Sequence, residues 1–171
     1  MDALKTKIRH VADFPKAGIL FYDVTTLLRD AEGFKLAIDA LATPHVGKGI
    51  DLVVGVESRG FILGAAVADR LGAGFVPVRK VGKLPGKTIR VTYDLEYGSD
   101  SLEMHDDAIT AGQRVLIVDD LLATGGTAKA TVDLVKQGGG SVEGVSVLIE
   151  LIELGGRARL AGQTVTTVLE Y

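Results

Sequence analysis

Short apolar runs alternate with longer amphipathic segments through much of the chain. Asp51–Val56, which reads DLVVGV, is a continuous apolar run of the kind found in strands that are covered on both faces. Phe61–Leu71 carries apolar residues at helical spacing, and Gly74–Arg79 returns to a strand pattern. These three segments predict a strand–helix–strand unit in which the two strands run parallel.

The same alternation recurs in the second half of the chain. Arg114–Val118 predicts another buried strand, Gly126–Gln137 predicts a helix, and Val142–Glu150 and Thr164–Leu169 predict the closing strands. Strands that alternate with helices favour an α/β fold, because each crossover helix returns the chain to the same end of the sheet. We therefore expect a mostly parallel central sheet flanked by helices.

Two regions depart from this alternation. Near the N-terminus, Leu4–Val11 predicts a short helix and Gly33–Leu41 a second one, whereas Asp13–Leu28 is too irregular for an assignment. Farther along, Ile89–Leu95 and Ser101–His105 predict an inserted hairpin. No repeat or low-complexity linker separates these regions, so we expect one domain over residues 1–171.

The composition narrows the classes of function. The chain has 171 residues and no cysteine, which excludes disulfides, thiolate catalysis and zinc–thiolate sites. A net charge of -3 gives no electrostatic footprint for nucleic-acid binding. Without a signal peptide or an apolar stretch of about 18 residues, we expect a cytoplasmic protein with no membrane partner. His10, His45 and His105 lack the spacing of a ligand pair, and we expect them at the surface or as caps.

Three polar segments follow predicted strand ends. ESRG (57–60) follows DLVVGV, KVGKLPG (80–86) follows GFVPVR, and DDLLATGGT (119–127) follows RVLIV. In open α/β sheets, ligands bind beyond the carboxyl ends of the strands. We therefore expect the three segments to converge on one crevice.

The residues Ala123–Thr127, which read ATGGT, lie between a predicted strand and a predicted helix. Glycine lets the backbone approach a ligand closely, and the N–H groups that open a helix lack intrahelical partners, so a monophosphate cradle is plausible. The GxxxxGK[ST] pattern of a triphosphate-binding loop is absent. A glycine-assisted turn with threonine as the helix cap is the alternative.

Asp119 and Asp120 come just before this segment. Two carboxylates accept hydrogen bonds from a vicinal diol such as the 2′ and 3′ hydroxyls of ribose, or they approach Mg²⁺. As alternatives, Asp119 binds magnesium in a phosphotransfer domain and Asp120 caps a helix. Neither alternative explains a phosphate cradle at this distance, so the pattern favours a site for a ribose 5-phosphate.

Basic residues gather in the other two segments. Arg59 lies in ESRG, and Arg79, Lys80, Lys83 and Lys87 cluster around one loop. Cationic side chains on a Gly- and Pro-containing backbone suit a multiply charged leaving group that is gripped and then released. For Lys87 we favour a solvated surface position, whereas Arg59 follows a strand end directly and is the stronger candidate.

The stretch VLIVDDLLATGGT (115–127) resembles the signature of the type I phosphoribosyltransferases. Further segments match the adenine-using members of that family in the same order over residues 13–155: DFPKAGILFYDVT, ESRGF, RKVGKLPGKT, YDLEYG and LEMHDDAI. The resemblance implies the type I phosphoribosyltransferase fold, with a small hood from about residues 1–30 and a flexible catalytic loop over about residues 80–105. It also implies a homodimer.

The implied reaction transfers phosphoribose from 5-phosphoribosyl-1-diphosphate to N9 of adenine and releases AMP and diphosphate, as in purine salvage. By the same resemblance, Mg²⁺ is the cofactor and is held mainly by the sugar diphosphate. It would lie near Asp119 and Asp120, with no protein residue expected as a direct ligand.

The resemblance also assigns roles to single residues. The 5-phosphate is assigned to Ala123, Thr124, Gly125, Gly126 and Thr127, and the ribose hydroxyls to Asp119 and Asp120. The diphosphate is assigned to Ser58, Arg59, Arg79, Lys80 and Lys83. Adenine is assigned to the backbone of Leu20, the ring of Phe21, Arg59 and, on its opposite face, Leu121. Glu96, Arg59 and Tyr97 are the implied catalytic residues, with Glu96 as the acid/base or charge-stabilising group in a closing loop.

One position departs from the family pattern. Tyr22 stands where many relatives carry arginine, and we expect it to pack in the core of the hood. Two other functions remain open: a regulatory sensor that only binds the sugar diphosphate, and the same transfer to another purine. The retained basic loop and EYG segment favour an enzyme over a sensor, and the DFPKAGILFYDVT segment favours adenine through the resemblance.

Overall fold

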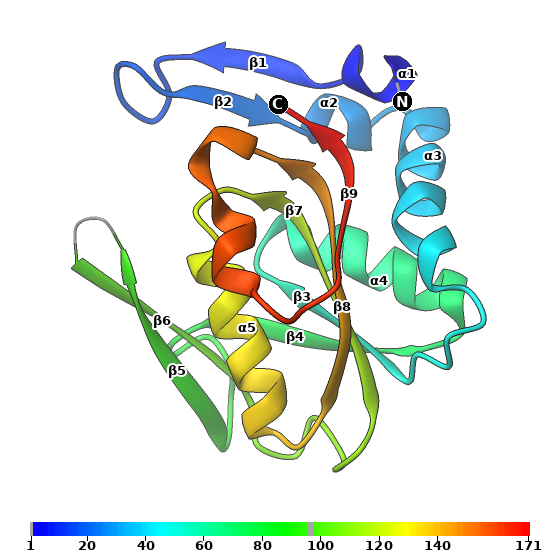
Figure 1. Ribbon diagram of the computed structural model, residues 1–171, viewed down its shortest axis with the longest axis vertical. Coiled ribbons are helices and arrows are strands. Elements are labelled where there is room, and N and C mark those ends of the chain that lie inside the picture. Colours follow the sequence, from blue (N-terminus) through cyan, green and yellow to red (C-terminus); the bar gives the residue numbers. More distant parts are fainter. Residues whose placement is uncertain (1, 96–97) are drawn as a thin grey trace.

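A computed structural model describes residues 2–95 and 98–171, and over these residues the fold is built around one seven-stranded sheet with strand order β5-β6-β4-β3-β7-β8-β9 (Figure 1). The helices are α1 (Asp2–Lys5), α2 (Thr25–Leu28), α3 (Ala31–Ala42), α4 (Arg59–Leu71) and α5 (Gly126–Gln137), with 3₁₀ turns η1 (Thr43–His45), η2 (Ile152–Leu154) and η3 (Gly156–Leu160). The strands are β1 (Arg9–Ala12), β2 (Leu20–Asp23), β3 (Leu52–Val56), β4 (Gly74–Lys80), β5 (Thr88–Leu95), β6 (Gly98–His105), β7 (Arg114–Leu122), β8 (Ser141–Glu150) and β9 (Val165–Glu170).

The predicted α/β fold with a mostly parallel sheet is confirmed. Strands β4, β3, β7, β8 and β9 pair in parallel, and at one edge of this sheet β6 pairs antiparallel with both β4 and β5. Along β7, Leu116 and Val118 pack with α3 and α4, whereas Val115 and Ile117 pack with α5. The strand is therefore buried on both faces, which explains why its sequence is a continuous apolar run.

The inserted hairpin is also confirmed. Strands β5 and β6 pair over their whole length, and β6 joins the sheet only through Arg79 and Lys80 at the end of β4. The hairpin consequently projects from the side of the sheet (Figure 1). Glu96 and Tyr97 lie outside the described residues.

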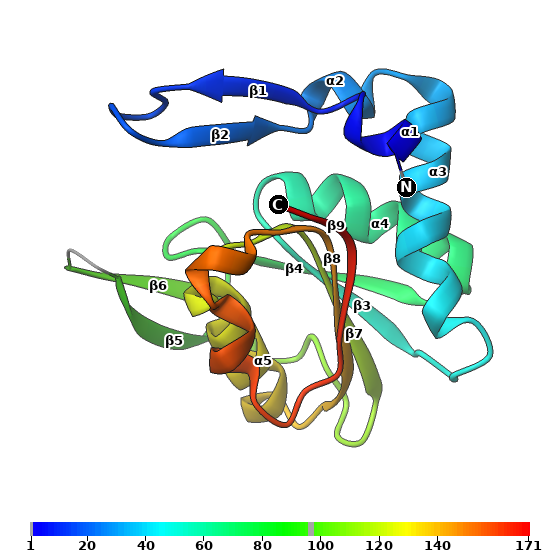
Figure 2. The same ribbon diagram turned by 45° about the horizontal axis from the view of Figure 1, so that its top comes forward.

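The helix predicted for Leu4–Val11 is largely wrong. Helix α1 ends at Lys5, and Arg9–Ala12 is strand β1, which pairs antiparallel with Leu20–Asp23. The stabilising partner of β1 lies about ten residues farther along, so local periodicity cannot reveal it. The β1–β2 hairpin lies above the end of the sheet as a separate two-stranded layer (Figure 2).

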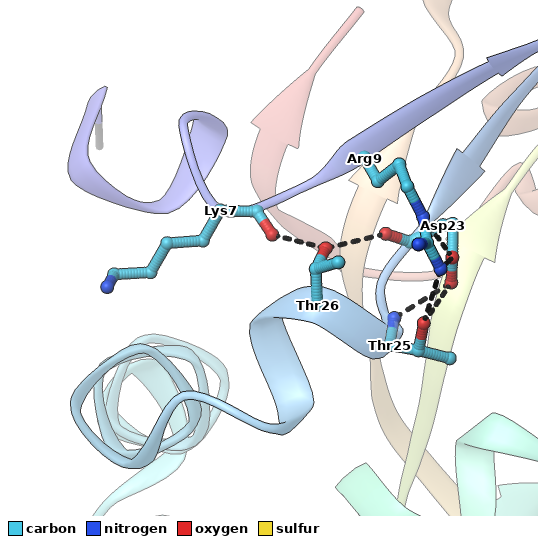
Figure 3. A network of polar contacts seen from close by, with 5 residues as sticks. All are labelled: Lys7, Arg9, Asp23, Thr25 and Thr26. Carbon is cyan, nitrogen blue, oxygen red and sulfur yellow. Dashed lines mark hydrogen bonds and ion pairs between the residues drawn. The ribbon is translucent and has the colours of Figure 1, made fainter.

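A polar network fixes this hairpin to α2 (Figure 3). The Asp23 carboxylate accepts hydrogen bonds from the Thr25 hydroxyl (2.7 Å), the Thr25 backbone N–H (2.9 Å) and Arg9 Nε (2.9 Å). The Thr26 hydroxyl donates to the Lys7 carbonyl (2.7 Å). Hydrogen bonds from Thr25 and then Arg9 lower the pKa of Asp23 from 3.8 to about 2.

Aromatic packing joins the hairpin to the C-terminus. The ring of Tyr22 lies 4.3 Å from that of Tyr171 and 5.1 Å from that of His10. Tyr22 is half-buried against the apolar cluster of α3 and α4, as expected for a packing residue. The expectation that His45 lies at the surface or caps a helix is wrong, because His45 is only 1% exposed and lies in η1.

Among the described residues, no helix is long and apolar enough to cross a membrane.

Candidate functional site

The candidate site lies where β3 and β7 end. These strands pair in parallel, so the segments that follow them lie side by side at one edge of the sheet. They enclose a cavity of about 250 Å³ whose lining is Glu57, Ser58, Arg59, Asp119, Asp120, Leu121, Leu122, Ala123, Thr124, Gly125, Gly126, Thr127 and Ala128. Two of the three polar segments that the sequence singled out therefore meet in one cavity.

The third segment does not line this cavity in the structure. Lys80 and Lys83 border a separate hollow on the hairpin side, together with Arg90 and Asp100. The Lys80 ammonium lies 3.2 Å from the Asp100 carboxylate, and this hydrogen-bonded pair raises the pKa of Lys80. Arg79 contacts a residue that lines the cavity, since its Nε is 3.5 Å from Glu57 Oε1. Its guanidinium carbon also lies 5.8 Å from the ring centre of Phe61.

The segment Ala123–Thr127 forms the tight entry to α5. Gly125 is the N-cap residue with a φ of 83°, a conformation that side chains disfavour. Its lack of a side chain leaves the first N–H groups of α5 without a side-chain cap among the described residues. The Thr127 hydroxyl pairs with the Tyr93 hydroxyl at 3.3 Å. The threonine-capped turn is therefore not what the structure contains, and the open N–H groups suit an anion.

Gly156 supports this segment from behind, and the sequence reasoning missed it. A Cβ on Gly125 would overlap the carbonyl oxygen of Gly156, and a Cβ on Gly156 would overlap that of Ala123. The two chain segments therefore pack backbone against backbone. The only signal in the sequence is the pair Gly155–Gly156, about thirty residues away and without any pattern that links it to the cavity.

Asp119 lies deep in the site, under the N-terminus of α4. A Cβ on Gly60 would come within 2.9 Å of Asp119 Oδ1, so glycine at this position lets the helix approach the carboxylate. Asp119 Oδ1 accepts a hydrogen bond from the backbone N–H of Asp120 (2.9 Å). Burial and then the adjacent Asp120 carboxylate raise the pKa of Asp119 well above its usual range. Perturbed carboxyls in a cavity are typical of functional sites.

Asp120 and Arg59 form an ion pair across the cavity. Asp120 is 7% exposed, and its Oδ2 accepts a hydrogen bond from Arg59 Nε. Burial lowers the pKa of Arg59, but the neighbouring Asp120 outweighs it and the pKa is raised overall. Asp120 therefore acts as the partner of the Arg59 cation rather than as a helix cap.

Arg59 also connects the cavity to the β1–β2 hairpin. Its guanidinium carbon lies 5.7 Å from the centre of the Phe21 ring, which is within the range of a cation–π contact. Leu121 lines the same cavity as Arg59. Leu20 is 44% exposed and precedes Phe21 on β2. Of the residues predicted to contact a flat base, Phe21 thus approaches Arg59 from the hairpin, and Leu121 lines the same cavity at the end of β7.

Two further carboxylates, which the sequence patterns did not single out, bind the segment 80–86, KVGKLPG, which we call the basic segment. Glu57 Oε1 accepts a hydrogen bond from the Lys80 backbone N–H (2.6 Å). Glu103, 3% exposed, accepts hydrogen bonds from the N–H groups of Gly82 (2.9 Å) and Leu84 (3.2 Å) and from the Thr88 hydroxyl. Burial raises the pKa of Glu103, but these hydrogen bonds outweigh it and lower the pKa overall. Glu57 lies in the quoted segment ESRGF and Glu103 in LEMHDDAI, but neither residue was assigned a role.

The carboxylates do not form a metal site by themselves. Over residues 2–95 and 98–171, no three His, Asp or Glu side chains are grouped so that they could hold a metal ion. Asp120 is paired with Arg59, and burial and then the Asp120 carboxylate raise the pKa of the neighbouring Asp119. This arrangement fits Mg²⁺ that is held mainly by phosphate oxygens and water, as is usual for this ion.

Comparisons with known proteins agree with this geometry. The family model described as phosphoribosyl transferase domain matches residues 25–157. A protein named adenine phosphoribosyltransferase from Acidobacterium capsulatum is 61% identical over 170 residues, which cover 99% of this chain and 94% of that protein.

Solved structures show the same similarity. The crystal structure of adenine phosphoribosyltransferase from Rhodothermus marinus superposes with a TM-score of 0.96 at 56% identity and covers 99% of this chain and 97% of that one. The enzyme of the same name from Saccharomyces cerevisiae, crystallised with an imino-altritol bisphosphate and adenine, superposes with a TM-score of 0.93 at 43% identity over 98% and 97% of the two chains.

Proposed function

The chain belongs to the phosphoribosyltransferase family, and we infer that it transfers phosphoribose from 5-phosphoribosyl-1-diphosphate to adenine, giving AMP and diphosphate. Such a reaction makes it a pentosyltransferase of purine salvage. The observation that carries the inference is the single cavity in which an aspartate pair and an uncapped helix N-terminus lie next to each other. The full-length similarity to proteins named adenine phosphoribosyltransferase supports adenine as the base.

We propose that Ala123–Thr127 binds the 5-phosphate through the free N–H groups at the start of α5. The helix dipole favours an anion there, and Thr124 and Thr127 add hydroxyl donors. Asp119 and Asp120, at the end of β7, would accept hydrogen bonds from the ribose hydroxyls. The location of both carboxylates in the same cavity as Ala123–Thr127 supports this role, because carboxylate oxygens accept hydrogen bonds from hydroxyl groups.

We propose that adenine lies between the Phe21 ring and Leu121, next to Arg59. The position of Phe21 near the Arg59 guanidinium supports a slot that closes over a flat base. The backbone of Leu20 would contact the 6-amino edge. A 6-oxo purine would then place an acceptor against a backbone acceptor, and this mismatch would disfavour hypoxanthine.

Breaking the bond between C1 and diphosphate develops positive charge on the ribose and negative charge on the leaving group. We propose that Asp119 and Asp120 stabilise the first charge and that Ser58, Arg59 and Arg79 stabilise the second. Mg²⁺, when bound with the substrate, would neutralise the diphosphate. Lys80 and Lys83 would reach the diphosphate only after the basic segment moves, because in the structure they border a different hollow.

We propose that the β1–β2 hairpin is the hood and that the segment from Lys80 to His105 is the lid that excludes water from the cationic sugar. Glu96 and Tyr97 lie outside the described residues, and their catalytic roles stay predictions, as does a cytoplasmic location. We also propose a homodimer, supported by exposed apolar side chains such as Ile62 and Val81, which a second subunit would cover. Sedimentation equilibrium checks the dimer, and a monomer at micromolar concentration would contradict it.

The proposed function is tested by turnover with each purine in turn. Purified protein is mixed with 5-phosphoribosyl-1-diphosphate, Mg²⁺ and adenine, hypoxanthine, guanine or xanthine, and diphosphate release is followed. We expect turnover with adenine only. Turnover with another purine but not adenine would overturn the base assignment, and tight binding of the sugar diphosphate without any turnover would favour a sensor.

A further inference from the structure

The 3₁₀ turn η3, Gly156–Leu160, packs against the proposed phosphate site although it follows the site by about thirty residues in the sequence. A Cβ on Gly156 would come within 2.9 Å of the Gly125 backbone nitrogen and would overlap the Ala123 carbonyl oxygen. The positions of Ala123 and Gly125 therefore depend on where Gly156 lies. Whatever holds Gly156 also holds the N–H groups that face the cavity.

Arg157, the next residue, holds η3 to the end of the sheet. Its Nε and Nη2 donate to the two carboxylate oxygens of Glu150, and its Nη1 donates to the Val165 carbonyl (3.0 Å). The Thr167 hydroxyl accepts from Arg157 (2.9 Å) and donates to Glu150 Oε2 (2.6 Å). We call Glu150, Arg157 and Thr167 the clamp.

The clamp has the features of a rigid support. Glu150 is 3% exposed, and the hydrogen bonds from Arg157 are the main cause of its lowered pKa. Planar, two-point pairing of arginine with a carboxylate restricts orientation as well as distance. The clamp joins β8 and β9 to η3 immediately beside Gly156. It therefore has the rigidity and the location needed to fix the backbone behind the cradle.

We propose that Glu150, Arg157 and Thr167 are positioning residues for the 5-phosphate: they hold Gly156 against Ala123 and Gly125, and so set the geometry of the N–H groups that bind the phosphate. This inference rests on the proposed function, because it assigns a support to the proposed phosphate site. The clamp itself does not line the cavity.

The chain offers a matched control for this clamp. Arg114 Nη2 pairs with Glu143 Oε2 at 2.8 Å and joins the starts of β7 and β8, whereas the Arg157–Glu150 pair joins η3 to the end of β8. Arg157 and Arg114 have similarly exposed side chains, at 47% and 48%. Arg157→Gln and Arg114→Gln thus each remove an arginine–glutamate ion pair, one beside the site and one far from it, and only the Arg157 pair is a two-point contact.

The test measures inhibition constants of AMP and adenosine for the wild-type protein and both variants. We expect Arg157→Gln to raise the inhibition constant of AMP roughly tenfold, as for the loss of a well-aligned hydrogen bond to a charged group. The inhibition constant of adenosine should stay unchanged. The KM for 5-phosphoribosyl-1-diphosphate should rise more than the KM for adenine. Arg114→Gln should change neither the ratio of the AMP and adenosine inhibition constants nor the ratio of the two KM values. This should hold even if Arg114→Gln lowers the melting temperature as much as Arg157→Gln does.

The outcomes distinguish failure of the proposed phosphate site from failure of the clamp inference. If the wild-type protein binds AMP no more tightly than adenosine, the proposed phosphate site is wrong and the clamp has no site to support. If the wild-type protein prefers AMP and Arg157→Gln keeps that preference, the clamp inference is wrong. Should Arg157→Gln fail to fold, Thr167→Val removes one hydroxyl from the clamp, and an unchanged AMP-to-adenosine ratio in that variant overturns the inference.

Discussion

The two sides of the candidate site are held in different ways. On the side of β7, Ala123–Thr127 packs backbone against backbone on Gly156, and the space there accommodates no additional side chain. On the hairpin side, side-chain contacts hold the basic segment: Lys80 with Asp100, Glu57 with the Lys80 N–H, and Glu103 with Gly82 and Leu84. The first side leaves little room for displacement, whereas the second depends on side-chain contacts alone. This division suits a substrate whose phosphoribose stays while its diphosphate leaves.

The largest effect is expected on the fixed side, from Asp119→Ala combined with Asp120→Ala. The double variant removes the proposed partners of the ribose hydroxyls and leaves Arg59 without its carboxylate. We expect kcat/KM for 5-phosphoribosyl-1-diphosphate to fall roughly 10³-fold, since loss of preorganised charge typically costs this much. Steady-state kinetics measure the change. Normal kinetics in the double variant would refute the assignment of the ribose site.

Gly125→Ala tests the close backbone packing itself. The new Cβ would overlap the Gly156 carbonyl oxygen, and the φ of 83° adds strain. We expect the KM for 5-phosphoribosyl-1-diphosphate to rise roughly a hundredfold and the free energy of unfolding to fall by about 1–3 kcal/mol. Gly72→Ala is the matched control, because its φ of 68° brings similar strain but its Cβ would meet no atom within 4 Å. Equal kinetic effects in both variants would contradict the account of the packing.

On the hairpin side, Glu103→Ala should have a smaller effect. Removing this carboxylate leaves the N–H groups of Gly82 and Leu84 without their acceptor and loosens the basic segment. We expect the KM for 5-phosphoribosyl-1-diphosphate to rise roughly fivefold to tenfold with a modest change in kcat, in line with the loss of hydrogen bonds to a charged group. Glu143→Ala, far from the site, is the control. A rise in KM as large as that expected for Gly125→Ala would contradict the distinction between the two sides of the site.

The smallest effect is expected in the β1–β2 hairpin, and this effect depends on pH. Because the pKa of Asp23 in the folded protein is lowered from 3.8 to about 2, its contribution to stability is complete above about pH 4 and is lost as the pH falls toward 2. Thr25→Ala removes the main cause of the shift and should move the pKa of Asp23 back toward its usual value. Carboxyl chemical shifts in an NMR titration measure it. An unchanged pKa in Thr25→Ala would show that the network in Figure 3 is not its cause.

Sequence patterns predicted the parts of the fold whose partners are periodic or close in the chain. The strand–helix–strand unit β3–α4–β4 and helix α5 appear within two residues of their predicted bounds. Because β3 and β7 pair in parallel, the same patterns also predicted that ESRG and DDLLATGGT meet. Strand β1 could not be predicted in this way, since its partner β2 lies in a segment without clear periodicity.

The missed parts of the site depend on contacts between distant segments. Gly156 packs against the backbone of Ala123 and Gly125, and nothing local in the sequence marks these residues as neighbours. Glu103 alternates along β6 like any strand residue, and only the folded hairpin shows that its carboxylate faces the basic segment. The sequence likewise placed Lys80 and Lys83 at the diphosphate, whereas the structure places them at a separate hollow.

A crystal structure of the protein with AMP tests the central claim most directly. We predict phosphate oxygens within hydrogen-bond distance of the N–H groups at the start of α5, ribose hydroxyls on Asp119 and Asp120, and adenine between Phe21 and Leu121. A nucleotide bound elsewhere, or one whose phosphate lies away from Ala123–Thr127, would contradict the account.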